Sequence, residues 1–433
     1  MHDEVDMIIV AMPFPYTGGG YRALLSIREY RKRGINPFLV LPWSLSFRFT
    51  AQERLFLLKE GMRVYGSATL PRIFSFHFPF RRSLANFYTS RFLPAVKIEI
   101  DRDIASNSHC VMSMHENSDA ITTCLRIGEV FSLKRIALLQ LPPFYGDSQR
   151  LKSIEEARYL WLETIEDFRT RALWSIFREI ERGISRNMKR LLNDFDLILA
   201  VSKSIPMEMG GEWSKKVVPL DPGVALSQED MLLINNVLRR TREKGKIVVF
   251  GGRPSPEKGL IEALIAFREI RKNCGQDFKL AITGRISGET LRKIRAFCDR
   301  LEIKDNVLFY GFLSREERLT IVAKSMVMLY PSHADAFSYA VLESLHLNTP
   351  VVAYDIPALR IYYSGLDGIT LVKESDIEAL AQKTIETIEK KDIHTEKPRF
   401  IKSWNEIIDE ETKLIKGILI FSSSQGVQEG RPL

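Results

Sequence analysis

The sequence predicts an α/β fold with two Rossmann-like parallel-sheet domains that face each other across a cleft. Its 433 residues are too many for one ordinary core, so we expect two domains of roughly 200 residues each. The order of apolar strand, polar loop and amphipathic helix recurs in both halves of the chain, as parallel sheets require. The 45% of hydrophobic residues suffices to fill both cores.

The first predicted strand, Met7 to Met12, leads into a turn with three glycines at 18–20. Apolar residues at helical spacing follow, and Gly34 is a helix stop signal. Glycines at the start of a helix let a ligand approach the backbone N–H groups. Gly19 and Gly20 are therefore candidate binding residues, although the turn does not match the spaced dinucleotide fingerprint Gly-x-Gly-x-x-Gly.

A histidine, His115, follows the apolar run Cys110 to Met112 at another expected strand end. A neutral imidazole there could hydrogen-bond a hydroxyl group, and it needs no metal for this. The alternatives are a solvent-facing or structural His115, or a role for His109 or His77 in its place. Gln140 marks a further strand exit at which ligand contacts could lie.

Apolar positions at nearly helical spacing run from Leu151 to Leu192 and predict one or two long amphipathic helices. We expect these helices to pack on the amino-terminal sheet. Two prolines and a glycine interrupt regular structure in 219–224. We therefore place an amino-terminal domain over 1–222 and a carboxyl-terminal domain over 223–404.

Two cations lie on a predicted strand-to-helix loop of the second domain. The apolar run Val248 to Phe250 predicts a strand, two glycines permit a tight exit, and helical spacing resumes after Lys258. Such loops lie at the carboxyl ends of parallel strands, where ligands bind. The guanidinium of Arg253 and the ammonium of Lys258 suit a pyrophosphate, although each also fits an ordinary surface charge.

A second strand-to-helix junction follows in the same domain. The run 326–330 predicts a buried strand, and Ser338 can start the next helix, whose free N–H groups can meet a phosphate. Asp335 precedes this helix and Glu343 lies inside it, so the two carboxylates have different roles. A carboxylate is a good bidentate partner for a ribose diol, but Asp335 also fits an acid that favours the helix dipole, and Glu343 an exposed glutamate.

These segments resemble the motifs of GT-B glycosyltransferases of family 4, which are retaining enzymes. Gly252-Arg253 to Lys258-Gly259 corresponds to the family's Gly-Arg-x-x-x-x-Lys-Gly loop, and Asp335 to Glu343 corresponds to its Glu-x7-Glu motif. The sequence departs from the family twice, because Asp335 is one methylene shorter than glutamate and Ala336 replaces the usual glycine.

The resemblance implies a role for each candidate residue. Arg253 and Lys258 would bind the donor diphosphate, and Glu343 would bind the ribose. Asp335 would hold the transferred sugar and the β-phosphate, together with the backbone of four residues: Ala336, Phe337, Ser338 and Tyr339. In the first domain, Gly19 and Gly20 would close over the donor diphosphate and the acceptor, and His115 would face the donor sugar. The helix that opens 405–433 would pack back on the first domain.

The function implied by the resemblance is transfer of a hexose from a nucleoside diphosphate sugar to a glycan or lipid-linked acceptor, with retention at the anomeric carbon. The nucleoside diphosphate sugar is a co-substrate, and neither a cofactor nor a metal is expected. Two alternatives stay open. A nucleotide-sugar epimerase of the same fold would need no acceptor, and a non-catalytic subunit would keep the fold without the reaction.

The basic and aromatic residues of the sequence indicate which macromolecular partners to expect. Lys and Arg number 62 against 54 acidic residues, but no nucleic-acid motif accompanies this excess, so no nucleic-acid partner is expected. Basic and aromatic residues are intermixed from Pro71 to Lys97. This mixture favours contact with an anionic membrane surface, and it equally fits a buried core with a surface helix.

Three features of the sequence predict a cytoplasmic protein, either free or at the inner face of the membrane. The four cysteines show no metal-ligand or redox spacing, which suits reduced thiols. The acidic start of the chain does not resemble a secretory signal. No apolar run is long enough to span a bilayer.

Overall fold

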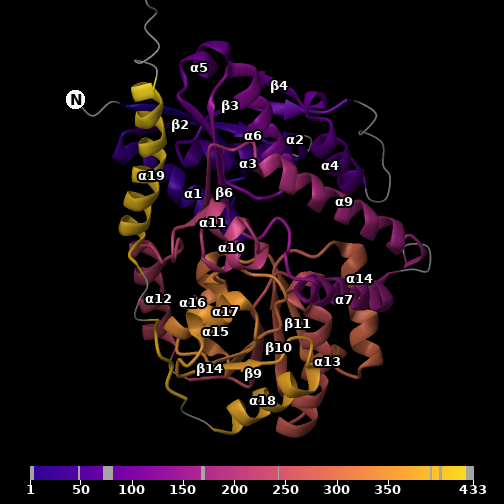
Figure 1. Cartoon of the computed structure of the whole chain (residues 1–433). Coiled ribbons are helices and arrows are strands. Elements are labelled where there is room, and N and C mark those ends of the chain that lie inside the picture. Colours follow the sequence, from indigo (N-terminus) through magenta and orange to yellow (C-terminus); the bar gives the residue numbers. More distant parts are fainter. Residues whose placement is uncertain are drawn as a thin grey trace, which may run out of the picture. The chain divides into compact units, whose positions relative to one another are not determined.

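The protein is described from a computed structural model in residues 4–46, 49–71, 81–166, 171–241, 243–390, 393–398 and 402–425. The chain forms two compact units, whose elements are labelled in Figure 1. The first unit comprises Met1–Gly146, Trp174–Val224 and Trp404–Leu433, and the second comprises Asp147–Leu173 and Ala225–Ser403. The predicted fold class, an α/β protein with two parallel-sheet domains, is confirmed.

The first unit contains a sheet in the order β4-β3-β2-β1-β5-β6-β7-β8. All neighbouring strands are parallel except the pair β3 and β4. The strands are Val5–Val10 (β1), Ile35–Leu41 (β2), Val64–Thr69 (β3), Lys97–Ile100 (β4), Cys110–Ser113 (β5), Lys134–Leu139 (β6), Leu197–Ala200 (β7) and Val217–Pro219 (β8). The helices are Gly18–Tyr30 (α1), Trp43–Ser46 (α2), Ala51–Lys59 (α3), Arg81–Arg91 (α4), Arg102–Asn107 (α5), Ser118–Phe131 (α6), Trp174–Leu192 (α9), Ser204–Met209 (α10), Trp213–Lys216 (α11) and Trp404–Gln425 (α19).

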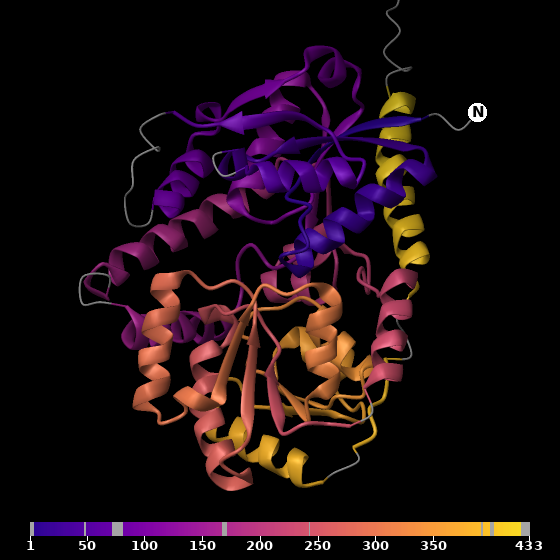
Figure 2. The ribbon, with the colours of Figure 1, turned by 180° about the vertical axis from the view of Figure 1, so that it is seen from behind.

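The second unit contains an all-parallel sheet in the order β11-β10-β9-β12-β13-β14, whose strands are visible in Figure 2. The strands are Ile247–Phe250 (β9), Lys279–Thr283 (β10), Val307–Gly311 (β11), Val327–Tyr330 (β12), Val351–Tyr354 (β13) and Ile369–Val372 (β14). The helices are Ser148–Ile165 (α7), Gln228–Arg240 (α12), Leu260–Cys274 (α13), Gly288–Arg300 (α14), Arg315–Lys324 (α15), Tyr339–His346 (α16), Pro357–Tyr363 (α17) and Ile377–Glu389 (α18), with a 3-10 turn at Pro256–Lys258 (η4).

Each sheet has a point at which the strand order reverses. In the first sheet β1 lies between β2 and β5, and in the second β9 lies between β10 and β12. Loops that leave the two strands on either side of such a point run to opposite faces of the sheet, which leaves room for a ligand at the carboxyl ends of the strands. The loops after β1 and β5, and the loops after β9 and β12, therefore hold the candidate site residues of each unit.

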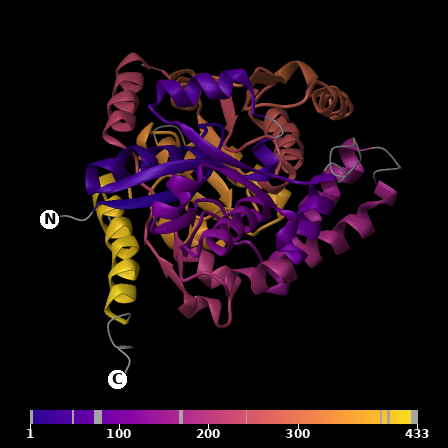
Figure 3. The ribbon, with the colours of Figure 1, turned by 90° about the horizontal axis from the view of Figure 1, so that it is seen from above.

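The helical segment that the periodicity predicts over 151–192 is divided between the units, so the expectation that all of it covers the amino-terminal sheet is wrong. Helix α9 packs against α4 and α6 in the first unit (Figure 3). Helix α7 packs against η4, α13 and α14 in the second. The first unit therefore lacks 147–173 of the expected domain 1–222. Periodicity shows that a face of each helix is buried, but it does not show which sheet receives that face.

One buried arginine ties together distant segments of the first unit. Arg22 of α1 is fully buried, and its Nε donates to the carbonyl oxygen of Gly223 at 2.8 Å. Its Nη2 lies 2.5 Å from Oε2 of Glu411, and its guanidinium lies 5.7 Å from the ring centre of Trp404. Helix α19 lies alongside α1 in consequence (Figures 1 and 2). Burial of a guanidinium group costs free energy unless the group is paired. The contacts of Arg22 therefore hold Gly223 and helix α19 against α1.

Candidate functional site

Two glycines let the loop after β9 approach strand β12 and the loop that follows it in the second unit. A Cβ atom at Gly251 would lie 2.5 Å from Sδ of Met328. A Cβ atom at Gly259 would lie 2.1 Å from the carbonyl oxygen of Pro331, and Gly259 also has a φ of +70°. Larger residues would push the loops apart or strain the backbone. The local sequence thus brings Lys258 of one loop next to Asp335 of the other.

The ammonium group of Lys258 donates hydrogen bonds to the loop that follows β12. Its Nζ donates to the carbonyl oxygen of Ala334 at 2.7 Å, to Oδ2 of Asp335 at 2.9 Å and to Oγ of Ser332 at 3.1 Å. The side chain is 14% exposed. Because an ammonium group has three N–H bonds, these partners account for all of them.

Asp335 is held as an ionised carboxylate. Its Oδ1 accepts from the N–H group of Ala336 at 2.9 Å, and its Oδ2 accepts from Lys258 and from the hydroxyl of Tyr330. Burial alone would raise the pKa of Asp335, but the charge of Lys258 and the hydroxyl of Tyr330 lower it below its ordinary value. The structure therefore pairs one fixed positive charge with one fixed negative charge at the switch point of the second sheet.

Arg253 lies on the same loop but outside this pair. It is exposed, and within the described part of the chain the structure gives it no hydrogen bond or ion pair. Burial would raise the pKa of Glu257, but Arg158 and, more weakly, Arg253 lower it. Arg253 thus adds positive potential to the loop and keeps an exposed guanidinium.

The helix α16 begins next to Asp335. Ser338 has a φ of +67°, which is strained for a residue with a side chain, and its Oγ accepts from the N–H group of Val341 at 3.3 Å. The hydroxyl of Tyr363 donates to the carbonyl oxygen of Ser338 at 3.1 Å. The ring of Phe337 packs edge-on against Tyr362, with ring centres 4.8 Å apart. These contacts fix the turn at the start of α16, and the positive end of a helix dipole favours an anion there.

Glu343 is buried and paired, so the alternative that it is an exposed glutamate is wrong. It is 1% exposed, and it accepts from two nitrogens of Arg318 at 2.6 and 3.0 Å. Nη2 of Arg315 lies 2.7 Å from Oε1 of Glu343, and Nε of Arg315 lies 2.9 Å from Asp230. Burial would raise the pKa of Glu343, but Arg318 and Arg315 lower it. The two arginines, three residues apart at the start of α15, were missed because no motif marks them.

In the first unit, His115 is a buried neutral imidazole. Its Nε2 accepts from the N–H group of Met12 at 3.0 Å, and burial lowers its pKa to about 4. The proton of the neutral ring is therefore on Nδ1, which can donate to a ligand. Of the two alternatives, His109 accepts from the N–H group of Asp6 at 3.1 Å, and His77 lies outside the described residues.

The glycine turn is built around Gln140. Nε2 of Gln140 donates to the carbonyl oxygens of Gly19 and Met114 at 3.0 and 2.7 Å, which ties the start of α1 to the end of β5. A Cβ atom at Gly20 would lie 2.2 Å from the carbonyl oxygen of Phe14. Oγ1 of Thr17 already accepts from the N–H group of Gly20 at 3.0 Å. The absence of a side chain at Gly20 thus lets the backbone of Phe14 lie close to it. The N–H group of Gly20 is bonded to Thr17, whereas the sequence led us to expect a bare N–H group.

A fully buried histidine in the loop that carries Asp335 was also missed. Nε2 of His333 lies 2.9 Å from Oε1 of Glu262, and Nδ1 lies 2.9 Å from Oε1 of Glu374. Burial would lower the pKa of His333, but the two carboxylates raise it to about 9. His333 is therefore an imidazolium at neutral pH. A histidine in the middle of a predicted strand exit was visible in the sequence, but its partners come from α13 and from the segment after β14.

The part of the chain that the structure describes lacks two further features. It holds no group of three or more His, Cys, Asp or Glu residues that could bind a metal ion. None of its helices has the length and apolar character to cross a bilayer.

The fold is of the GT-B type, and it is similar to the folds of solved glycosyltransferases. A glycosyltransferase from Rickettsia africae has a TM-score of 0.54, 14% identity and coverage of 96% of this chain and 99% of its own. The Anabaena protein HepE, solved in complex with UDP, has a TM-score of 0.55, 13% identity and coverage of 95% and 99%.

The sequence comparisons match most of the second unit to a family model. Residues 238–403 match the model of glycosyl transferases group 1, in agreement with the resemblance seen in the sequence. A 2-deoxystreptamine glucosyltransferase from Streptomyces kanamyceticus is 29% identical over 118 residues, which are 27% of this chain and 30% of that protein. Matches to the curated relatives span between 24% and 43% of their length. The narrower assignment to family 4 stays a prediction.

The buried imidazolium predicts a pH dependence of stability. The pKa of about 9 in the folded protein lies above the ordinary value of 6.5, so His333 stabilises the second unit fully below pH 6.5. This stabilisation is lost as the pH rises through 9 and is on the order of 3 kcal/mol. Urea unfolding at pH 6.5 and at about pH 10, read by pulse proteolysis with fragments assigned to each unit, measures it.

The variant His333→Asn should remove this part of the pH dependence, whereas His109→Asn, which changes a histidine of the first unit, should keep it. An equal loss of stability at high pH in the unmodified protein and in His333→Asn would show that His333 is not charged in the folded state.

Proposed function

We propose that this protein is a retaining glycosyltransferase that moves a hexose from a nucleoside diphosphate sugar to a glycan or lipid-linked acceptor. The observation that carries the proposal is the pair of Lys258 and Asp335 beside the start of α16, at the switch point of the second sheet. The match to glycosyl transferases group 1 supports transfer, and the UDP complex of the structurally similar HepE supports a nucleotide-linked donor.

The proposed chemistry uses charges that are already in place. As the bond between the anomeric carbon and the diphosphate breaks, negative charge develops on the departing phosphate. The ammonium of Lys258, the exposed guanidinium of Arg253 and the N–H groups at the start of α16 would stabilise this charge more strongly in the transition state than in the bound donor. The diphosphate would share Lys258 with Asp335, which would accept hydrogen bonds from sugar hydroxyls.

Glu343 is still the proposed partner of the ribose. Both of its oxygens are paired with arginine, so a ribose diol would have to bind beside Arg315 and Arg318 or replace one of their contacts. The partly exposed guanidinium groups of these two arginines, 26% and 29% exposed, are then additional donors to the nucleotide. In the first unit, we propose Gly19, Gly20 and His115 as contacts of the donor sugar and the acceptor.

The rival reactions predict different products. A nucleotide-sugar epimerase converts the donor when no acceptor is present, and a non-catalytic subunit leaves the donor unchanged under all conditions. Incubation of the donor alone, followed by analysis for a new epimer, separates these cases from transfer. The family match lies over the unit that holds Lys258 and Asp335, and this favours transfer.

Replacement of Lys258 by alanine tests the proposal. We expect Lys258→Ala to lower turnover by roughly 100-fold or more, since it removes a charge that stabilises the leaving group. The matched control is Lys246→Ala, because Lys246 lies just before β9 and makes an exposed ion pair with Asp277. Circular dichroism checks that both variants fold. Near-normal transfer by a folded Lys258→Ala protein would contradict the proposed site.

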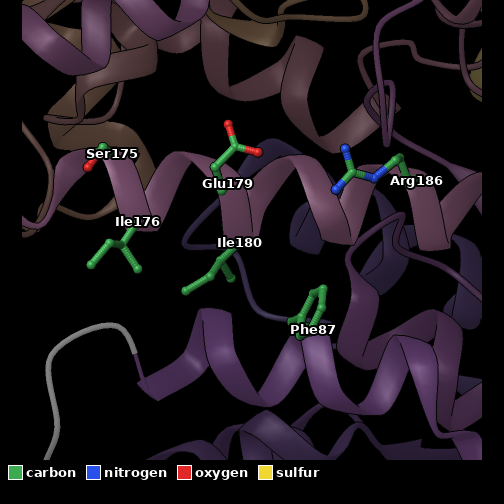
Figure 4. A pocket seen from close by; sticks show the side chains of 6 residues that line it. All are labelled: Phe87, Ser175, Ile176, Glu179, Ile180 and Arg186. Atoms are coloured by element: carbon green, nitrogen blue, oxygen red, sulfur yellow. The ribbon is translucent and has the colours of Figure 1, made fainter.

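We also propose that α4 and α9 contact an anionic membrane surface, which would bring the protein to a lipid-linked acceptor at the inner face of the membrane. Gly183 of α9 packs so closely on α4 that a Cβ atom there would lie 2.6 Å from the ring of Phe87. Figure 4 shows Ile176 and Ile180 pointing from α9 toward α4 and Phe87 pointing back, around an open groove.

Apolar and basic side chains are exposed on α4 and α9 and at Phe92, directly after α4. Ile176 is 58% exposed, Phe92 51% and Tyr88 38%. The exposed basic residues are Arg82, Arg91, Arg186, Lys189 and Arg190. Such a surface suits the boundary between anionic headgroups and acyl chains. The aromatic residues at 74, 76, 78 and 80, which also led us to expect membrane contact, lie outside the described residues.

Vesicle sedimentation tests this contact. The protein should sediment with phosphatidylglycerol vesicles at low salt and not with phosphatidylcholine vesicles. The double variant Ile176→Glu and Phe92→Glu should lose most of this binding. Leu232→Glu, at a position that is 60% exposed on α12 of the second unit, should keep it. Absence of binding to anionic vesicles at low salt would remove the membrane proposal.

A further inference from the structure

Helix α7 packs in the second unit, although the chain segments before and after it belong to the first. Gly146 and Trp174 lie in the first unit, and 147–173 lie in the second. The buried face of α7 includes Ile154, Ala157 and Trp161, and it packs against η4, α13 and α14. This face explains why the helix stays on the second unit. It does not explain the two arginines that α7 directs at the loops of the candidate site.

Arg150 contacts the loop that carries Asp335. Its Nη2 donates to the carbonyl oxygen of His333 at 2.6 Å, and its Nη1 lies 2.5 Å from Oε2 of Glu374. The other oxygen of Glu374 contacts Nδ1 of His333. The side chains of Arg150 and Glu374 are 11% and 13% exposed. Arg150 therefore holds this loop through its backbone and through a carboxylate that also binds the His333 ring.

Arg158 contacts the loop that carries Lys258. Its Nε lies 2.9 Å from Oε1 of Glu257, the residue before Lys258. The carbonyl oxygen of Glu257 accepts from the N–H group of His333 at 2.9 Å, so the two loops are also bonded to each other. Arg150 and Arg158 lie two turns apart on one helix, and each holds one of the loops.

These contacts become important when a diphosphate competes for Lys258. In the structure, Lys258 is itself a main anchor of the Asp335 loop, through Ala334, Ser332 and Asp335. A diphosphate that draws the ammonium toward itself weakens these bonds, and the loop then depends on its other anchors. The bonds from Arg150 and Arg158 do not involve Lys258, so the loss of its contacts does not itself break them.

We propose that Arg150 and Arg158 are positioning residues that keep Lys258 and Asp335 in the arrangement that binds the donor diphosphate. This inference rests on the proposed function, because it assigns the pair of loops to the donor. The competing explanation is that the two arginines only fasten α7 to the second unit. That explanation predicts a change in thermal stability and no change in ligand affinity for the folded protein.

The test is calorimetric titration of the full-length protein with uridine, guanosine and adenosine diphosphate, well below the melting temperature. For the diphosphate that binds, Arg158→Gln and Arg150→Gln should each raise the dissociation constant by about tenfold, since each removes hydrogen bonding by a charged group. Arg158→Lys keeps a charge that can reach Glu257 and should stay within about twofold of the unmodified protein. Arg240→Gln is the control, because Arg240 makes an exposed ion pair with Glu316.

The outcomes separate this inference from the proposed function. Unchanged affinity in both glutamine variants, with lower melting temperatures, overturns the positioning role. The proposed function stands in that case if Lys258→Ala abolishes binding. If no diphosphate binds the unmodified protein, or if Lys258→Ala binds as well as the unmodified protein, then the proposed function itself fails.

Discussion

The candidate site depends on one ammonium group that is held by a neighbouring loop. Lys258 comes from the loop after β9, and all of its hydrogen-bond donors are taken by the loop after β12. The two strands are adjacent at the point where the strand order reverses, and the glycines at 251 and 259 let their loops meet. A positive charge is thus fixed next to the start of α16 before any ligand arrives, which is the arrangement that lowers the cost of binding and stabilising an anion.

The same unit keeps several carboxylates ionised in buried places. Asp335 is paired with Lys258, Glu343 with two arginines, and Glu374 with Arg150 and His333. In each case burial would raise the pKa, and the partners lower it. Because an unpaired buried charge is costly, these pairs restrict the loops to the positions in which every charge has a partner. The first unit also contains a buried pair of an arginine and a carboxylate, Arg22 and Glu411.

The sequence was a good guide to the parts of the site that depend on local order. Apolar runs, glycine exits and helical spacing predicted loops at 251–259 and 331–336, and these loops hold Lys258 and Asp335 in the structure. The partners of these residues could not be predicted in the same way. Arg315, Arg318 and Arg150 come from helices that reach the site only through the fold, and α7 was expected on the wrong sheet because its apolar stripe fits either one. Glu343 illustrates the difference, since its motif position was clear and its burial against two arginines was not.

The central claim is that Lys258 and the start of α16 hold the diphosphate of an activated sugar. A crystal structure of the protein with a bound nucleoside diphosphate sugar tests this claim most directly. We expect the diphosphate oxygens within hydrogen-bonding distance of Nζ of Lys258 and of the N–H groups that begin α16. A donor bound elsewhere, with Lys258 still bonded only to the Asp335 loop, would contradict the claim.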